Sequence, residues 1–320
     1  MEFPTANAPH VVAGYTVPRV MFQVLLALVP VLAVQVYLFG PGPVWLVAVA
    51  CVTALACEAL ALALRRRSSQ AALRDGSVLV TAALLALAVP PLLPWWIIAF
   101  GTAVAVLVGK HAYGGLGQNP FNPAMVGYAV LLVSFPLEMT RWPVPGPDWD
   151  ALTGATALDA LRTGLREGYT MEEVRAEAGF GRVGAAGAEW VNLAALAGGA
   201  WLLARRIIRW HIPVGVLAGL AVPAALAHGL DPGAHAGATF HLASGAAMLG
   251  AFFIATDPVS AATSDRGRLI YGAGIGLLTW IIRSWGGYPD GVAYAVLLMN
   301  LAVPLLDRAT VPRIHGQPRR

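Results

Sequence analysis

The chain is dominated by apolar runs that are close to the length of a membrane-spanning helix. Such a helix needs about 20 mainly apolar residues to cross the hydrocarbon core of a bilayer. Hydrophobic residues make up 58% of this chain and charged residues only 12%, whereas a soluble domain carries about 25% charged residues. So few charges cannot cover a water-facing surface. The sequence therefore predicts an integral membrane protein and excludes a soluble enzyme, a disordered chain and a coiled coil.

About ten apolar runs can be traced, five on each side of a more polar segment. Two of them are interrupted by proline: the third stops at Pro90-Pro91 and the eighth at Asp257-Pro258. Because proline ends a helix, we expect short, broken helices inside an all-α bundle. The runs lie at roughly 20–39, 43–64, 77–90, 94–110, 122–136, 189–208, 211–228, 240–256, 268–284 and 290–306.

The two halves of the chain share a local similarity. Residues 126–132 in the fifth run resemble residues 291–298 in the tenth, and Gly114-Gly115 corresponds to Gly286-Gly287. Because each half has an odd number of spans, the second half must cross the membrane in the opposite direction, which is an inverted 5+5 repeat. The predicted parts are a first five-helix membrane repeat at 1–136, a periplasmic segment at 137–188 and a second five-helix repeat at 189–320.

The basic residues predict an orientation. Lysine and arginine are enriched in cytoplasmic loops, and an inside amino terminus places most of the 21 basic residues in cytoplasmic segments. The short outer loops then carry only Arg283. We therefore expect a multi-pass protein of the cell inner membrane with both termini cytoplasmic. The scattered basic groups are expected to contact membrane lipid and not nucleic acid.

One heptapeptide in the polar segment carries a chemical signal. Residues 150–156 read Asp150-Ala151-Leu152-Thr153-Gly154-Ala155-Thr156 and fit Asp-x-x-(Ser/Thr)-Gly-Ala-Thr at each fixed position. This resembles the acceptor motif for covalent flavinylation, in which the last threonine carries FMN through a phosphoester. A phosphate on Thr156 would lie at the amino terminus of a helix predicted to run to about residue 164, where free N–H groups favour an anion. The alternative is an ordinary helix cap in a loop of small residues.

Two further patterns frame this motif. The proline-rich stretch 136–147 predicts extended, helix-poor backbone. Downstream, Thr170-Met171-Glu172-Glu173 has the spacing of a capping box, which predicts a second short helix.

The remaining motifs carry a family resemblance over nearly the whole chain. They lie at 109–124, 256–261, 288–294 and 300–307, and the first includes Gly117-Gln118-Asn119-Pro120-Phe121-Asn122-Pro123-Ala124. Together with the heptapeptide, these stretches resemble the RnfD/NqrB family. Its members are membrane subunits of the Rnf ion-translocating electron-transport complex and of the sodium-pumping NADH:quinone reductase. Because the first span starts near residue 20, we expect the RnfD branch.

The resemblance implies a membrane electron-transfer subunit of an Rnf-type ferredoxin/NAD oxidoreductase complex, without an NADH site of its own. It implies covalent FMN on Thr156 and contact with the other Rnf-type subunits, especially the periplasmic FMN-bearing RnfG-like subunit. NqrB-like proteins also hold a non-covalent riboflavin. Its candidate contacts here are Asn119 and Asn122, because Asn offers both donors and acceptors; their alternative role is turn formation before the fifth span.

Ionisable residues inside spans are functional candidates by default. Glu58 and Asp257 are the candidates for an ion path. Alternatively, Glu58 pairs or snorkels near the inner surface, about two turns from Arg65, and Asp257 caps broken backbone. No metal site is expected. The alternative function is a small-solute channel or transporter of the inverted five-plus-five type. The flavinylation heptapeptide argues against this alternative.

Overall fold

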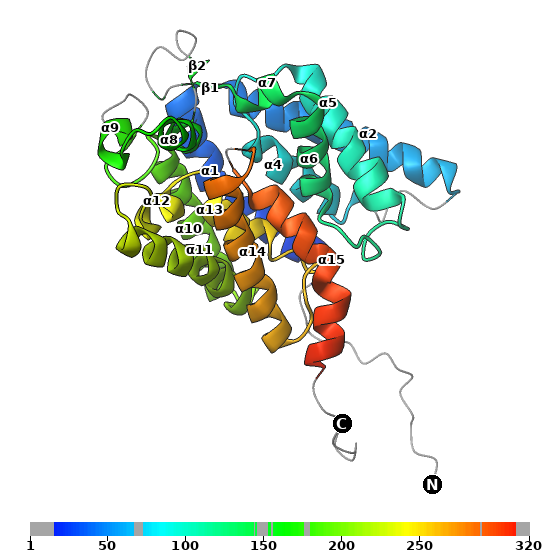
Figure 1. Cartoon of the computed structure of the whole chain (residues 1–320). Coiled ribbons are helices and arrows are strands. Elements are labelled where there is room, and N and C mark those ends of the chain that lie inside the picture. Colours follow the sequence, from blue (N-terminus) through cyan, green and yellow to red (C-terminus); the bar gives the residue numbers. More distant parts are fainter. Residues whose placement is uncertain are drawn as a thin grey trace, which may run out of the picture.

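The chain folds into a bundle of helices of unequal length (Figure 1). The computed structural model describes residues 16–66, 73–143, 145, 153–154, 156–175, 180–288 and 290–311. The predicted all-α membrane protein is confirmed, since four described helices are long and apolar enough to cross a membrane alone. These are α1 (Val17–Phe39), α2 (Gly42–Leu64), α11 (His211–Leu230) and α15 (Val292–Thr310).

Shorter helices complete the bundle, and each predicted span contains at least one helix. Two of them include π-helical turns, η1 and η2, a form that is rare and concentrated at functional sites. The number of membrane crossings stays a prediction. These elements are α4 (Ser77–Ala88), α5 (Trp95–Val104), η1 (Ala105–His111), α6 (Pro123–Ser134), α10 (Ala188–Ala204), α12 (Ala238–Ala243), α13 (Ala247–Leu249), η2 (Gly250–Ile254) and α14 (Asp265–Trp285).

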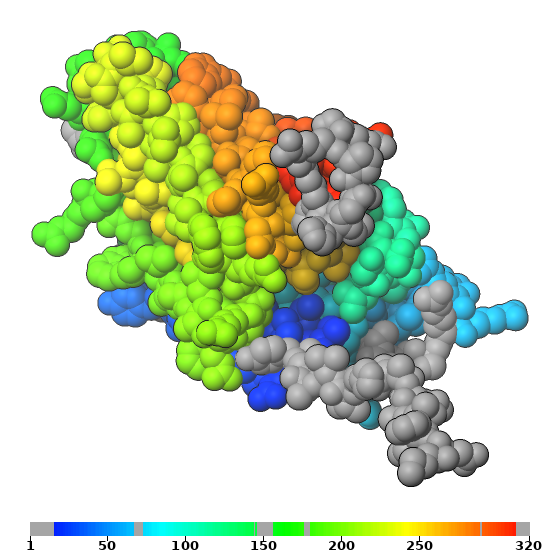
Figure 2. Space-filling model, turned by 90° about the horizontal axis from the view of Figure 1, so that it is seen from below, coloured from blue at the N-terminus to red at the C-terminus, as the bar shows by residue number. Residues whose placement is uncertain are grey.

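The packing follows the same scheme in both halves. Helix α2 packs against α4 and α5, and α11 packs against α12 and α14; α5 then contacts α6, as α14 contacts α15. Across the halves, α1 packs on α10 and α6 on α15. Helices α2, in light blue, and α11, in yellow-green, lie on opposite sides of the bundle (Figure 2). These contacts agree with two repeats whose matching helices meet at the centre of the bundle. That the two repeats are inverted relative to each other stays a prediction.

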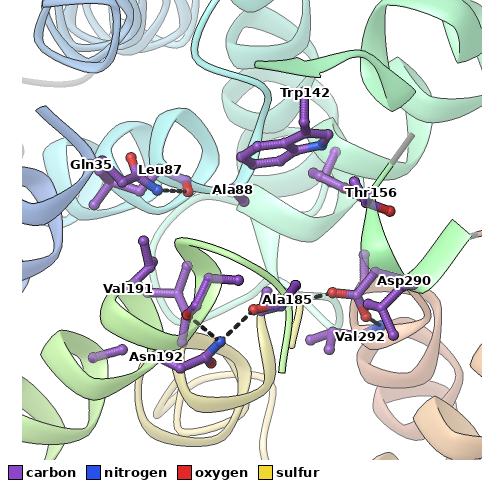
Figure 3. Close-up of a pocket in the computed structure, with 18 of the residues that line it drawn as sticks. Gln35, Leu87, Ala88, Trp142, Thr156, Ala185, Val191, Asn192, Asp290 and Val292 are labelled. Atoms are coloured by element: carbon purple, nitrogen blue, oxygen red, sulfur yellow. Dashed lines mark hydrogen bonds between the residues drawn. The ribbon is translucent and has the colours of Figure 1, made fainter. Parts of the chain in front are cut away.

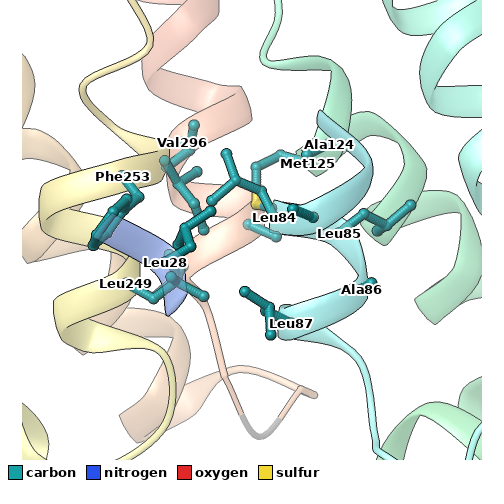
Figure 4. Packing of buried hydrophobic residues seen from close by; sticks show 14 of the residues in the cluster. Leu28, Leu84, Leu85, Ala86, Leu87, Ala124, Met125, Leu249, Phe253 and Val296 are labelled. Carbon is teal, nitrogen blue, oxygen red and sulfur yellow. The ribbon is translucent and has the colours of Figure 1, made fainter. Parts of the chain in front are cut away.

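The hydrophobic core lies where the short helices meet (Figure 4). Residues 82–87 of α4 are all buried, which is typical of a helix enclosed by other helices. With 12 residues, α4 is about 18 Å long and is therefore too short to cross a core of about 30 Å. Its carbonyl group at Leu87 is satisfied by Gln35 of α1, whose Nε2 donates to it at 2.9 Å.

The eighth predicted span contains an interruption that the sequence analysis did not place. Residues 244–246 between α12 and α13 are not helical. Gly245 has a φ of +59°, and a Cβ added there would lie 2.4 Å from Oδ2 of Asp290. Glycine adopts a left-handed conformation at little cost, so this break depends on Gly245 both for its backbone angle and for the close approach.

Buried side chains satisfy the backbone around this break. Arg283 donates to the carbonyl oxygens of His241 at 2.6 Å and Ser244 at 3.1 Å. It also pairs with Asp290 at 3.1 Å, and the Arg283 side chain is fully buried. Asp290 in turn accepts a hydrogen bond from the N–H of Ala246 at 2.8 Å.

Asn192 of α10 completes this arrangement. Its Nδ2 donates to the carbonyl of Gly245 at 2.9 Å, and its Oδ1 accepts from the N–H of Met248 at 2.9 Å. Non-helical backbone at membrane depth is tolerated only where protein groups pair with it. We call Asn192, Arg283 and Asp290 the brace, because together they hold the broken eighth span to α10, α14 and the start of α15.

The polar segment lies at the end of the bundle opposite the carboxyl end of α15 (Figure 1). Its described elements are α7 (Pro136–Thr140), β1 (Trp142–Pro143), β2 (Thr153–Gly154), α8 (Ala157–Arg166) and α9 (Met171–Arg175), and β1 pairs antiparallel with β2. The prediction of extended backbone from residue 136 was wrong for residues 136–140. Pro136 occupies the first helical turn, where proline is favoured, and Glu138 complements the helix dipole there.

The predicted capping box at Thr170 is confirmed. Glu173 Oε2 accepts from the backbone N–H of Thr170 at 2.7 Å and from its hydroxyl at 2.9 Å. The N–H of Glu173 donates back to the Thr170 hydroxyl at 3.4 Å. Hydrogen bonding from Thr170 lowers the pKa of the Glu173 carboxyl, because it stabilises the ionised form.

Replacing Arg283 by Met should destabilise the protein strongly. The change leaves Asp290 and two carbonyl groups without their buried donor, and breaking a buried pair costs about 3–5 kcal/mol. Arg209→Met is the matched control, because Arg209 pairs with Asp265 where both side chains are more than half exposed, and such pairs contribute little. The measurement is the monodisperse fraction in size-exclusion chromatography after heating in detergent. Equal transition temperatures for the two variants would contradict the role given to the brace.

Candidate functional site

Thr156 is the N-cap of α8, as predicted. Its backbone is extended, with φ −64° and ψ 154°, and its Oγ1 accepts a hydrogen bond from the N–H of Asp159 at 3.2 Å. Its carbonyl accepts the first helical hydrogen bond, from Ala160. The hydroxyl that the heptapeptide singles out therefore lies at the positive end of a ten-residue helix, where an attached anion is stabilised.

Helix α8 is held to the membrane bundle by two kinds of contact. Its apolar side, including Leu158 and Leu161, packs in a small cluster with Phe240 of α12. Next to this apolar side, Arg162 and Arg166 donate to the backbone carbonyl of Gly286, at 3.3 and 3.2 Å. Cations near the carboxyl end of a helix, here α14, are electrostatically favourable. Thr156 is thus placed at a fixed position against the bundle.

Thr156 borders a pocket that runs inward between the two halves of the chain (Figure 3). We call it the Thr156 pocket. It encloses about 1400 Å³ of space free of protein atoms, counting its open mouth. Its walls come from α1, α4, α6, α10, α13 and α15 together with β1, and they are mainly apolar. The polar side chains that line it are Gln35, Tyr128, Trp142, Thr156, Asn192 and Asp290.

A second pocket brings together three of the other residues that the sequence analysis singled out. Asn119, Asn122 and Asp257 all line it, although Asp257 comes from the opposite half of the chain. Lys110 and Phe253 line it as well. We call it the Asn119 pocket. An apolar cavity with a few convergent polar groups is the usual form of a ligand site.

Part of the hydrogen-bonding capacity of these residues is used structurally. Asn122 caps α6 by accepting from the N–H of Met125 at 3.2 Å, and its Nδ2 donates to the last carbonyl of η2, at Ile254, at 3.1 Å. Asn119 Nδ2 donates to the carbonyl of Phe121 at 2.9 Å. Turn and cap formation, the alternative role considered for both residues, is therefore present in the structure.

Asp257 follows η2 and also stabilises a turn. Its Oδ2 accepts from the hydroxyl of Ser260 at 2.7 Å, and its Oδ1 accepts from the N–H of Val259 at 3.4 Å. The capping role considered for Asp257 is thus observed. Asp257 also lines the Asn119 pocket, so its capping role does not exclude contact with a ligand.

Glu58 is buried and paired, with Lys110 instead of its sequence neighbour Arg65. Lys110 Nζ lies 2.9 Å from Oε1 and 3.0 Å from Oε2 of Glu58, and it donates to the Ser77 hydroxyl at 3.0 Å. His111 Nε2 lies 2.8 Å from the same carboxylate. Arg65 donates to the backbone carbonyl of His111. The π-helical turn η1 presents Lys110 and His111 to α2 together, which a sequence cannot indicate.

The other heptapeptide residues are only partly described. Thr153 and Gly154 form β2, opposite Trp142 and Pro143 of β1. The predicted attachment-motif residues Asp150 and Ala155 lie outside the described residues. Of the residues that the sequence analysis missed, Gln35, Asn192 and Lys110 carried a usable signal, because each is a polar residue within an apolar run. Asp290, at the start of the tenth run, gave no such signal.

Comparison with known proteins agrees with the family resemblance that the motifs and their order predict. A model of the NQR2, RnfD, RnfE family matches residues 4–316. The chain belongs to this family. Its relatives include the D subunit of the ion-translocating oxidoreductase complex of Pseudomonas aeruginosa (strain UCBPP-PA14), which is 53% identical over 334 residues, covering 99% of this chain and 96% of that protein. The predicted family membership is confirmed.

Proteins with the same description occur in other bacteria. The D subunit from Vibrio cholerae serotype O1 (strain ATCC 39541 / Classical Ogawa 395 / O395) is 49% identical over 347 residues, covering 99% of this chain and 100% of the relative. That of Escherichia coli O127:H6 (strain E2348/69 / EPEC) is 48% identical over 348 residues, with 99% coverage of both chains. These family members match the chain over nearly its full length, so the resemblance concerns the whole bundle.

Removing one partner of the buried Glu58–Lys110 pair should be costly. Glu58→Leu or Lys110→Met alone should destabilise the protein by about 3–5 kcal/mol, because each leaves an uncompensated buried charge. The double variant should regain most of that stability, since replacing a buried pair by apolar residues is often neutral. The measurement is thermal unfolding in detergent of the parent chain, the two single variants and the double variant, which together form a double-mutant cycle. Additive losses in the double variant would show that the two charges do not compensate each other.

Proposed function

We propose that this chain is the membrane electron-transfer subunit of an Rnf-type ion-translocating ferredoxin/NAD oxidoreductase complex, with FMN covalently bound to Thr156. The proposal is supported by family membership, by relatives described as the D subunit of an ion-translocating oxidoreductase complex, and by the flavinylation heptapeptide. The observation that carries it is the position of Thr156 as the cap of α8 at the border of a large pocket. A catalytic NADH site is not part of the proposal.

The residues at Thr156 fit an FMN phosphoester. Esterification would make Oγ1 a weaker hydrogen-bond acceptor. The phosphate oxygens would instead accept from the free N–H groups at the start of α8, and these groups favour an anion. A tether at this position leaves the rest of the cofactor next to the Thr156 pocket. FMN supplies one- and two-electron redox chemistry. The chain supplies attachment at Thr156, electrostatic stabilisation by α8 and a mainly apolar pocket that limits contact with water.

We also propose that the Asn119 pocket holds the second, non-covalent flavin, riboflavin. Asn119 and Asn122 line that pocket with Lys110 and Asp257, which gives it amide, cationic and anionic groups among apolar ones. Amide groups suit the hydrogen-bonding edge of a flavin. Both asparagines also make the structural hydrogen bonds described above, so they would hold the flavin from positions that are already fixed.

Location and partners follow from the same proposal. The chain would lie in the cell inner membrane with both termini cytoplasmic and residues 137–188 in the periplasm. There Thr156 would face an RnfG-like subunit that carries its own FMN, and the bundle would contact the other Rnf-type subunits. Of the two candidate ion-path residues, Asp257 is the better one, because the charge of Glu58 is compensated by Lys110.

Thr156→Val should abolish the covalent flavin. After expression with a flavin transferase, the parent chain should give a fluorescent band in a denaturing gel and an intact mass increased by one FMN phosphoester, and the variant should give neither. Thr170→Val is the control, since Thr170 caps α9 in the same segment but lies outside the motif. A parent chain without flavin would contradict the proposal and favour a small-solute channel, whereas normal electron flow through a Thr156→Val complex would favour a purely architectural role.

Asn119→Leu should reduce the non-covalent flavin and leave the covalent flavin unchanged. The change removes a polar group from the Asn119 pocket and breaks one hydrogen bond within the described residues, to the Phe121 carbonyl, so the fold should persist. The measurement is flavin released by acid from the purified chain, relative to flavin retained on the polypeptide. Gln23→Leu, on α1 outside both pockets and in contact with Trp201, is the comparison and should leave both flavin fractions unchanged. Unchanged release from Asn119→Leu would place the second flavin elsewhere.

A further inference from the structure

We propose that the Thr156 pocket receives the isoalloxazine ring of the tethered flavin and that Gln35 binds the pyrimidine edge of that ring. This inference rests on the proposed function, because it requires a flavin on Thr156. It adds the place of the redox-active ring and a residue that positions it. The carrying observation is that Thr156 and Gln35 line one pocket from opposite sides (Figure 3).

The tether limits where the ring can go. In FMN, a phosphate and a five-carbon ribityl chain separate the attachment oxygen from the three fused rings. The ring must therefore lie within one cofactor length of Thr156. Thr156 is positioned rigidly by α8, and the pocket beside it is formed by both halves of the bundle. A ring that enters this pocket leaves water, which is favourable for its large apolar surface.

The shape and chemistry of the pocket suit a flat aromatic system. Trp142 lies on one side of it, and Val191 lies with Asn192 across from Trp142 (Figure 3). The lining is otherwise mainly apolar, with Leu132 and Met125 from α6. Ligand sites for such molecules combine apolar walls with a small number of polar groups that fix the orientation, and here these include Gln35 at one end and Thr156 with Asp290 at the other.

Among the amide and carboxylate side chains that line the pocket, Gln35 has the most hydrogen-bonding capacity left for a ligand. Asn192 uses both hydrogens of its amide, on the carbonyls of Ala188 and Gly245. Asp290 accepts from Arg283 and from two backbone N–H groups, and it lies on the Thr156 side of the pocket. Gln35 makes one hydrogen bond within the described part of the chain, from Nε2 to the Leu87 carbonyl.

Gln35 therefore keeps an acceptor and one donor hydrogen for a ligand. The pyrimidine edge of a flavin presents an N–H between two carbonyl groups, so a carboxamide can accept from the N–H and donate to a neighbouring carbonyl. Gln35 is 3% exposed and lies near the end of an apolar helix. A buried amide in a membrane helix is costly and marks a functional position. Its bond to Leu87 O orients the amide, since it fixes which end faces the pocket.

The test compares Gln35→Leu with Gln23→Leu in the full chain matured with a flavin transferase. Gln23 lies on the same helix, but it contacts the exposed Trp201 and not the pocket. The spectrum of the tethered flavin is obtained by subtracting Thr156→Val, which removes any non-covalent flavin signal. Gln35→Leu should shift that spectrum and lower the midpoint potential, because a donor to a ring carbonyl stabilises the reduced, more negative flavin. Gln23→Leu should change neither.

A second measurement needs no pocket variant and keeps the inference testable if Gln35→Leu misfolds. Iodide should quench the tethered flavin of the native parent chain several-fold less than the same flavin after denaturation, because the ring is enclosed. Equal quenching of the native and the denatured flavin would overturn the inference, and so would a flavin in Gln35→Leu with the spectrum and midpoint potential of the parent. As long as the parent chain shows the covalent flavin band, the proposed function is not affected by either result. Absence of the covalent band in the parent chain would overturn both.

Discussion

The structure depends on how broken helices satisfy their backbone inside a membrane. Hydrocarbon offers no hydrogen bonds, so each unpaired N–H or carbonyl group must find a protein partner. In this chain, side chains from other helices provide them: Gln35 pairs with the end of α4, Asn122 with the end of η2, and the brace with residues 244–246. Each polar contact joins elements that are far apart in sequence, so the same groups that permit the breaks also hold the bundle together.

The breaks create the two pockets. Helix α4 is too short to fill the depth of a bilayer and the α12–α13–η2 segment is interrupted at 244–246, and the space beyond their ends is lined by polar groups that are already fixed. The Thr156 pocket lies at the end of α4 with Gln35, and the Asn119 pocket lies at the end of η2 with Asn122 and Asp257. A chain that carries electrons between partners needs rigid sites for its redox groups. Under the proposed function, the residues that satisfy the backbone are also the ones that would position the cofactors.

Much of the local structure could be predicted from the sequence because it depends on short-range chemistry. Proline placed the end of α4, and the spacing Thr170 to Glu173 gave a capping box that the structure contains. Thr156 was predicted as a helix cap for the same reason. The break at 244–246 was not predicted, because its cause is the distant brace, with only Gly245 as a local sign. Residues 136–140 were misjudged because proline favours both extended backbone and the first turn of a helix.

The sequence by itself determined the membrane class and the family, and it singled out Thr156 as the predicted attachment residue for a flavin, since these follow from composition, motif order and contiguous residues. Only the tertiary structure decided that Glu58 pairs with Lys110, that Asn119 and Asp257 share a pocket, and that Gln35 lies across a cavity from Thr156. The physical reason is that these contacts join elements that are far apart in sequence, and in one case, Asn119 with Asp257, the two halves of the bundle. A contact between two packed helices produces no periodicity or spacing in the sequence that would predict it.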